Sequence, residues 1–130
     1  MLKLDKPLAF LDLETTGINL GADRIVEISI LKISPDGKEE SLTMRINPGM
    51  AIPKESTAIH GISDEDVKDA PLFKDAAEQL NAFLHNCDIA GYNSNKFDIQ
   101  MLAEEFLRAE KRFDENRRYL DVIRISTLMA

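Results

Sequence analysis

The chain has 130 residues, enough for one domain with one hydrophobic core and too few for two. Hydrophobic residues make up 44% and charged residues 30%, as in an ordinary soluble globular protein. The formal net charge of −7 argues against broad attraction to nucleic acid. It does not exclude an enzyme that acts there through metal ions, because carboxylates that bind metals count as negative charge.

Two features of the sequence predict where the protein resides. No apolar stretch is long enough to cross a bilayer, and Met1 is not followed by a signal peptide, so we expect a cytoplasmic protein without a membrane partner. The single cysteine, Cys87, cannot form an internal disulfide and lies in an apolar stretch. We expect it to be a buried core thiol.

The first part of the chain predicts three strands in an antiparallel meander. Residues 6–16 carry apolar side chains on both faces, which is typical of a central strand covered on both sides. Residues 24–33 are rich in β-branched side chains, and residues 39–47 predict a third strand. An Asp-Gly turn within residues 34–38 connects the second strand to the third.

The remainder of the chain predicts helices that alternate with strands. Residues 48–67 are punctuated by prolines and glycines and carry short helical turns. Apolar side chains at three- and four-residue spacing predict helices over residues 73–84 and 93–112. Residues 87–92 and 117–123 predict two further strands. We therefore expect an α/β fold, a mixed sheet with helices packed on it.

Two acids, Asp12 and Glu14, stand one residue apart where the first predicted strand ends. Residues i and i+2 of a strand share a face, with side chains roughly 6.5–7 Å apart. In a poorly solvated place their charges repel unless a cation lies between them. Oxygen ligands suit Mg²⁺ or Mn²⁺, and two such ions roughly 3.5–4 Å apart catalyse phosphoryl transfer. The spacing also fits two solvated acids at a strand end.

A third acid, Asp98, falls in the first turn of the helix predicted over residues 93–112. An acid there interacts favourably with the helix dipole and can cap backbone N–H groups, so it needs no functional role. The alternative is that this helix end directs Asp98 to the same cleft as Asp12 and Glu14. The position of Asp98 by itself leaves both interpretations open.

Four segments occur in order along the chain: FLDLETTG at 10–17, AIHGISDEDV at 58–67, GYNSNKFDIQML at 91–102 and YLDV at 119–122. Together they resemble the DEDD superfamily of 3′–5′ exonucleases, and most closely the epsilon (proofreading) subunit of bacterial DNA polymerase III and its stand-alone relatives. The resemblance runs from Leu8 to Leu128. It implies one exonuclease-like domain over residues 1–130 with a ribonuclease H-like α/β fold, a mixed five-stranded sheet flanked by helices.

The resemblance also implies roles for individual residues. Asp12 would bridge two Mg²⁺ or Mn²⁺ ions, Glu14 would help to bind the catalytic ion, and Asp98 would act at the second. These catalytic residues would hydrolyse phosphodiester bonds at the 3′ end of single-stranded DNA, with RNA as the less favoured substrate. A DNA polymerase subunit is an implied partner. The implied substrate-binding residues are Thr15, Thr16, Gly17, Ile59, His60 and Asn93.

One motif of the family is absent from this sequence. Members with a histidine base carry a His and then a fourth Asp after the last strand and a helix, and neither His60 nor His85 matches that His. We expect a C-terminally truncated domain that lacks this helix and is weak or inactive, since general base catalysis alone is worth about 10²–10⁴-fold. Sheet surface left uncovered by the missing helix would favour a homodimer.

Two other functions remain open. The first is a catalytically silent module that binds a nucleic-acid 3′ end or a polymerase. The second is a phosphatase of the haloacid-dehalogenase type with Asp12 as its nucleophile. That family calls for a second Asp where this chain has Glu14, and it leaves the other matching segments unexplained.

Other charged segments are interpreted as structural. Basic residues from Arg108 to Arg118 alternate with acids, which predicts a solvated helix end and loop and not a phosphate-binding surface. Ser63 and Asp66 predict a short capped turn. Glu27 lies on the second predicted strand, where a polar residue needs no catalytic explanation.

Overall fold

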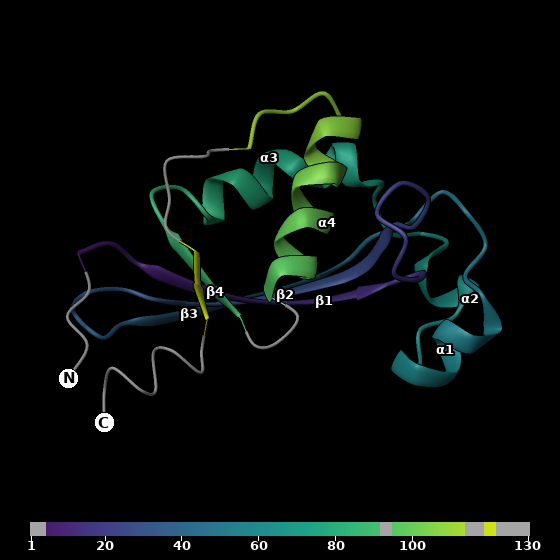
Figure 1. Ribbon diagram of the computed structural model, residues 1–130, viewed down its shortest axis with the longest axis horizontal. Coiled ribbons are helices and arrows are strands. Elements are labelled where there is room, and N and C mark those ends of the chain that lie inside the picture. Colours follow the sequence, from purple (N-terminus) through teal and green to yellow (C-terminus); the bar gives the residue numbers. More distant parts are fainter. Residues whose placement is uncertain (1–4, 92–94, 114–118, 122–130) are drawn as a thin grey trace.

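Figure 1 shows the computed structural model, which describes residues 5–91, 95–113 and 119–121. The strands are β1 (Leu8–Thr15), β2 (Ile25–Ile33), β3 (Glu39–Arg45), β4 (Asp88–Gly91) and β5 (Tyr119–Asp121). They form one sheet in the order β3-β2-β1-β4-β5, which makes β1 the central strand. β2 is antiparallel to β1 and β3, whereas β4 is parallel to β1 and β5. The predicted mixed five-stranded sheet is confirmed.

A tight turn joins β2 to β3 and confirms the predicted hairpin. The Ser34 N–H donates to the Lys38 carbonyl at 2.9 Å, and the Gly37 N–H donates to the Ser34 carbonyl at 2.8 Å. Gly37 has a φ of +88°, which glycine adopts without steric cost. This turn sets the β2–β3 register, in which Ile28 lies opposite Met44.

Two long helices cover one face of the sheet, and two short ones lie beyond one end of β1 (Figure 1). The helices are α1 (Lys54–His60), α2 (Asp64–Val67), α3 (Phe73–Phe83) and α4 (Asn95–Arg108). Helices α3 and α4 pack their apolar faces on Ala9, Leu11 and Leu13 of β1 in one continuous core. The Phe106 ring is buried in this core, 5.0 Å from Phe73 edge-to-face and 4.9 Å from Phe113 in a stack.

A second, small core is formed by Val26 of β2, Val67 of α2, and Ile52 and Ile62, which lie on either side of α1 in the chain. Helix α1 ends at Gly61, which takes the left-handed conformation with a φ of 77°. Helix α2 begins with a capping box, in which the Ser63 N–H donates to the Asp66 carboxylate at 2.9 Å. The hydrogen bonds from the Ser63 N–H and the Ser63 hydroxyl lower the pKa of Asp66. The predicted capped turn is confirmed.

The order of strands and helices agrees with the sequence prediction. The helix predicted over residues 93–112 is observed from Asn95 to Arg108. Cys87 is buried, as expected for a core thiol. Across the described part of the chain, no helix is long and apolar enough to cross a membrane. Of the last strand, predicted over residues 117–123, the start at 117–118 and the end at 122–123 lie outside the described residues.

The prediction that β1 is covered on both faces is wrong for its second half. On the face opposite α3 and α4, Leu8 is buried, Phe10 is half-buried and Asp12 is exposed. Both long helices pack on the other face (Figure 1), so exposure on this face increases from Leu8 to Asp12. The carboxyl ends of parallel strands are where α/β sheets commonly bind ligands.

Candidate functional site

Asp12 and Glu14 share the open face of β1 at its carboxyl end. Because Asp12 is exposed, the expected repulsion in a poorly solvated place does not describe its surroundings. Glu14 is half-buried and lies opposite Glu27 of β2. Burial first, and then the charge of Asp12, raises the pKa of Glu14. His60 lowers it and Glu27 raises it to a smaller extent. The β1–β2 register shifts just after Glu14, an irregularity that re-aims side chains near functional sites.

Asp98, in the first turn of α4, is the buried member of this acidic group, with 6% of its surface exposed. Burial raises the pKa of Asp98 to about 6, and the charges of Asp12 and Glu14 act in the same direction. A hydrogen bond from the Leu13 backbone opposes the shift. Because Asp98 interacts electrostatically with both acids of β1, the structure brings the three predicted catalytic side chains into one cluster.

The three acids do not form a ready-made metal site. Within the residues that the structure describes, no group of three or more His, Cys, Asp or Glu side chains is arranged to hold a metal ion. Like-charged carboxylates repel without a cation between them, and the raised pKa of Asp98 reflects first its burial and then this repulsion. The donors themselves, carboxylates from a strand and a helix, are those that a hard divalent cation prefers.

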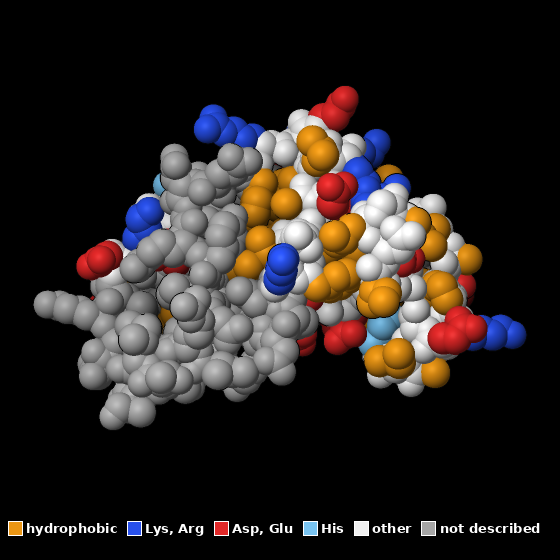
Figure 2. Space-filling model, in the orientation of Figure 1, with side chains coloured by type: hydrophobic (Ala, Val, Ile, Leu, Met, Phe, Trp, Pro, Cys, Tyr) orange, Lys and Arg blue, Asp and Glu red, His pale blue; other side chains and the backbone are white. Residues whose placement is uncertain are grey.

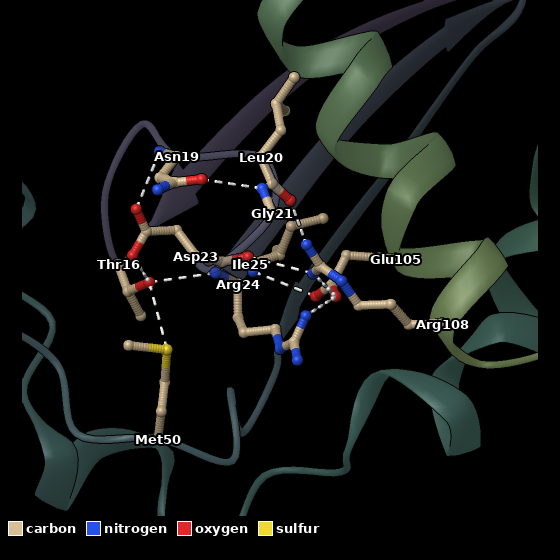
Figure 3. A network of polar contacts seen from close by, with 10 residues as sticks. All are labelled: Thr16, Asn19, Leu20, Gly21, Asp23, Arg24, Ile25, Met50, Glu105 and Arg108. Atoms are coloured by element: carbon tan, nitrogen blue, oxygen red, sulfur yellow. Dashed lines mark hydrogen bonds and ion pairs between the residues drawn. The ribbon is translucent and has the colours of Figure 1, made fainter.

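The loop between β1 and β2, residues 16–24 and here called the β1–β2 loop, is held in one shape by Thr16 and Asp23 (Figure 3). Thr16 is 1% exposed, and its hydroxyl donates to Asp23 Oδ1 at 2.8 Å and accepts from the Arg24 N–H at 3.0 Å. Asp23 Oδ2 accepts from the Asn19 N–H at 2.9 Å. The loop is therefore ordered by its own polar groups.

Gly17 allows this loop to close. A Cβ atom at Gly17 would lie 2.4 Å from Asp23 Oδ2, too close for any real contact. The Gly17 carbonyl also accepts the Thr15 hydroxyl at 2.7 Å. A larger residue in place of this glycine of the Asp-Leu-Glu-Thr-Thr-Gly segment would displace the Asp23 carboxylate.

Helix α1 is tied to the end of β1 by two side chains. The Ser56 hydroxyl donates to the Thr16 carbonyl at 2.6 Å. His60 Nε2 donates to the Thr15 carbonyl at 3.1 Å, and His60 Nδ1 accepts from the Ile62 N–H at 3.1 Å. Because a carbonyl only accepts and an N–H only donates, these partners assign the tautomer with the proton on Nε2. Both ring nitrogens of His60 are therefore engaged with the backbone.

Of the other two predicted substrate-binding residues, Ile59 and Asn93, the structure describes only Ile59. Ile59 on α1 is 85% exposed and precedes His60 in the chain. Figure 2 shows hydrophobic and acidic side chains close to a histidine on this part of the surface. Ile18, which directly follows Gly17, is 87% exposed and was not singled out from the sequence. The same loop also contains the apolar Leu20 and Ala22, so the sequence carried no distinct signal for Ile18. Asn93 lies outside the described residues.

Arg108 does not belong to a solvated helix end, so that prediction is wrong for this residue. Its side chain is only 21% exposed and pairs with the buried Glu105. Lys111 and Arg112 are exposed, as predicted. Sequence reasoning missed the role of Arg108 because its partners, the carbonyls of Leu20 and Asp23, are distant in the chain.

Comparison with known protein families decides the assignment. The family model described as Exonuclease (RNase_T) matches residues 9–129. The chain belongs to this exonuclease family. The resemblance drawn from the sequence motifs is thereby confirmed, and the acidic cluster at the end of β1 lies in a domain of that family.

Curated relatives of this exonuclease-family chain are named for the epsilon subunit of DNA polymerase III. A DNA polymerase III subunit epsilon-like protein of Rhodobacter capsulatus is 33% identical over 91% of the chain and 17% of the relative. The DNA polymerase III subunit epsilon of Buchnera aphidicola is 31% identical over 87% of the chain and 51% of the relative. That of Rickettsia conorii is 38% identical over 80% and 45%. The chain thus spans about half or less of the length of these relatives.

Solved structures show the same fold. Escherichia coli exonuclease I in complex with a dT13 oligonucleotide has a TM-score of 0.80 at 16% identity, over 95% of this chain and 29% of that one. Exonuclease I from Methylocaldum szegediense has a TM-score of 0.79 at 18% identity, over 95% and 29%. At these identities the likeness concerns the fold of the exonuclease domain, which agrees with the expected ribonuclease H-like sheet.

Proposed function

We propose that the chain is a metal-dependent 3′–5′ exonuclease domain that removes nucleotides from the 3′ end of single-stranded DNA. The observation that carries the proposal is the convergence of the charges of Asp12, Glu14 and Asp98 at the open end of β1. Burial of Asp98 close to two like charges costs free energy, which favours a role at a ligand site. Residues 1–130 act as a single domain in this proposal.

Asp12, Glu14 and Asp98 are the residues that would hold the metal, as two Mg²⁺ or Mn²⁺ ions. When bound, such ions neutralise charge on the scissile phosphate and lower the pKa of water so that it can attack. Asp98 supports this assignment because its burial disfavours its charge without a counter-ion. A divalent cation supplies that counter-ion and reverses the local sign of the site.

The chain's own backbone would receive the 3′-terminal nucleotide. The segment Thr15–Gly17 ends the strand and is held from both sides, by α1 through Ser56 and His60 and by Asp23 through Thr16. A rigid backbone next to the acids positions a substrate without an entropy cost at the moment of reaction. Ile59 is exposed to contact a base.

His60 would act by positioning and not by taking a proton. Its Nε2–H and Nδ1 are both used by backbone partners, so the ring fixes the Thr15 carbonyl and the turn at Ile62. The apolar Ile59 side chain beside it is the part of this segment left free to line a base pocket. The predicted contact between His60 and the last base stays a prediction.

The names of the relatives favour DNA over RNA. Curated relatives are named for the epsilon subunit of DNA polymerase III, and one structural neighbour is a complex with a dT13 oligonucleotide. We extend this to the present chain as its substrate class, with a DNA polymerase subunit as its partner and proofreading as its role. RNA as a substrate, a homodimer and the location in the cytoplasm stay predictions.

The test is degradation of a 5′-labelled single-stranded DNA in Mn²⁺, with enzyme in excess over substrate so that slow cleavage is also detected. We expect a ladder that shortens from the 3′ end and is lost in Asp12→Ala. Asp69→Ala is the matched control, since it removes an exposed acid far from β1 in the sequence. A 3′-phosphorylated oligonucleotide should resist.

The absence of any ladder from the wild-type chain overturns the exonuclease proposal. Fluorescence anisotropy with the same DNA then decides the alternative. Binding that requires a free 3′ end would support a catalytically silent binding module. Cleavage that survives Asp12→Ala would instead point to a contaminating nuclease or to a different site.

A further inference from the structure

The last turn of α4 carries a buried carboxylate with a set of partners unlike those of Asp98. Glu105 is 4% exposed, although it lies on a helix that packs an apolar face against the sheet. Its Oε2 accepts from the Ile25 N–H at 3.1 Å. Its Oε1 accepts from Arg108 Nη1 at 2.8 Å and lies 3.9 Å from Arg24 Nη1. Two arginines and a backbone N–H therefore hold this charge.

Arg108 extends the contact from the helix to the β1–β2 loop (Figure 3). Its Nη1 donates to the Asp23 carbonyl at 3.1 Å as well as to Glu105, and its Nη2 donates to the Leu20 carbonyl. The guanidinium is a planar fork with donors at fixed angles, so three acceptors set its position closely. A lysine ammonium in its place could not reproduce this arrangement.

These contacts join two regions that are far apart in the sequence. Arg108 and the Leu20 carbonyl are separated by 88 residues, and Glu105 and the Ile25 N–H by 80. The loop also has internal bonds from the N–H groups of Ala22 and Asp23 to the Asn19 carbonyl. Those bonds give the loop its shape, whereas Glu105 and Arg108 fix that shape to α4.

Asp98 and Arg108 lie in the first and last turns of helix α4. Ten residues separate them, so they are about 15 Å apart along the helix axis at a rise of about 1.5 Å per residue. Its first turn supplies the buried acid of the proposed metal-binding group, and its last turn supports the loop that begins at Thr16. The same rigid helix thus sets both the acid and the loop, through bonds made at opposite ends.

We propose that Glu105 and Arg108 are positioning residues that hold the β1–β2 loop in the shape that receives the 3′-terminal nucleotide, an inference that rests on the proposed exonuclease function. Neither side chain touches the acids of β1 among the contacts of the described residues. Their loss should therefore weaken substrate binding more than it slows the chemical step.

The experiment compares Arg108→Lys with Arg112→Lys in steady-state kinetics on a short single-stranded DNA. Arg108→Lys keeps the positive charge beside Glu105 but loses the fork, and Arg112 supplies a matched control with an exposed side chain near the same helix end. We expect KM to rise about tenfold for Arg108→Lys, the change expected from loss of one hydrogen bond of a charged group, with kcat changed by less. Arg112→Lys should leave both constants unchanged.

A second measurement does not depend on turnover. Hydrogen exchange should become faster at the amides of Gly21, Ala22 and Asp23 in Arg108→Lys and stay unchanged in Arg112→Lys, at a temperature well below the melting point of both. Glu105→Gln should act in the same direction, because it removes the charge between Arg24 and Arg108.

The outcomes separate the two proposals. A wild-type chain that neither binds nor cleaves DNA refutes the exonuclease function, whatever the exchange data show. Unchanged exchange in the loop of Arg108→Lys refutes the positioning role, even if the enzyme is active. Faster exchange with an unchanged KM also refutes it, since the pair would then contribute only to stability.

Discussion

Helix α4 carries two buried carboxylates in opposite electrostatic situations. Glu105 has two arginines within ion-pair distance and a backbone donor. Asp98 has Asp12 and Glu14 as its charged neighbours, and no ion pair to a cation is found for it within the described residues. A buried charge that serves the fold is matched by the chain itself. A buried charge left facing like charges is typical of a site completed by a ligand.

The largest expected effect separates the two acids by function. Asp98→Asn should reduce exonuclease activity by at least about 100-fold, because even residues that only support a metal ligand are worth about 10–100-fold. Glu105→Gln should reduce kcat/KM by about tenfold at most, through the loop. Single-turnover rates in saturating Mn²⁺ measure the loss of activity in each of the two variants. Equal losses in the two variants would contradict the division of roles along α4.

The next largest expected effect is a pH dependence of the stability of the folded chain. The pKa of Asp98 is about 6 in the folded chain against an ordinary value of 3.8. The folded state thus binds this proton more tightly than the unfolded state, so the stability it contributes is present below about pH 3.8 and lost as pH rises through about 6. The raised pKa of Glu14 acts in the same direction.

Thermal unfolding in EDTA, measured from pH 4 to pH 8, tests this linkage. The melting temperature of Asp98→Asn should increase relative to that of the wild type as pH rises, because the amide cannot ionise. Adding Mg²⁺ at pH 8 should stabilise the wild type more than the variant, since the ion binds only the folded state. A constant difference between the two proteins at every pH would show that Asp98 titrates normally.

The sequence predicted the sheet well because the signals were local. Alternating apolar residues, the Asp-Gly turn and the spacing of apolar residues in α3 each act within a few residues, and all were observed. The three acids were also identified, through their motifs. Whether Asp12 is exposed was left open by the spacing of the acids, because its exposure depends on which face α3 and α4 cover.

The contacts of Arg108 could not be predicted, for a related physical reason. Its acceptors are backbone carbonyls, which every residue possesses, so the sequence carries no mark of them. A basic residue near a helix end is most often solvated, and only tertiary packing shows the exception. The role of Asp23 was hidden in the same way, since its bonds to Thr16 and Asn19 form only in the folded loop.

A smaller effect would test whether the β1–β2 loop depends on the close approach at Gly17. Gly17→Ala should destabilise the chain by about 1–3 kcal/mol, because the new Cβ would displace the Asp23 carboxylate from Thr16 and Asn19. In an Asp23→Ala background the same change should cost much less. Chemical denaturation of the four proteins gives this coupling. Additive losses would mean that Gly17 is needed for a reason other than Asp23.

The smallest expected effect concerns Glu27, which faces Glu14 across the two strands. Glu27→Gln removes a negative neighbour, so the pKa of Glu14 should fall slightly and its carboxylate should ionise at lower pH. The change is small because burial and Asp12 are the larger causes, and because Arg45 already pairs with Glu27 at 3.4 Å. Carboxyl chemical shifts followed by NMR against pH would detect it. Because Glu27 lies beside the acidic group without belonging to the proposed ligands, activity in saturating Mn²⁺ should stay within a factor of about two. A loss as large as that of Asp98→Asn would make Glu27 a fourth member of the site, and the contrast between matched and unmatched acids would then extend to β2.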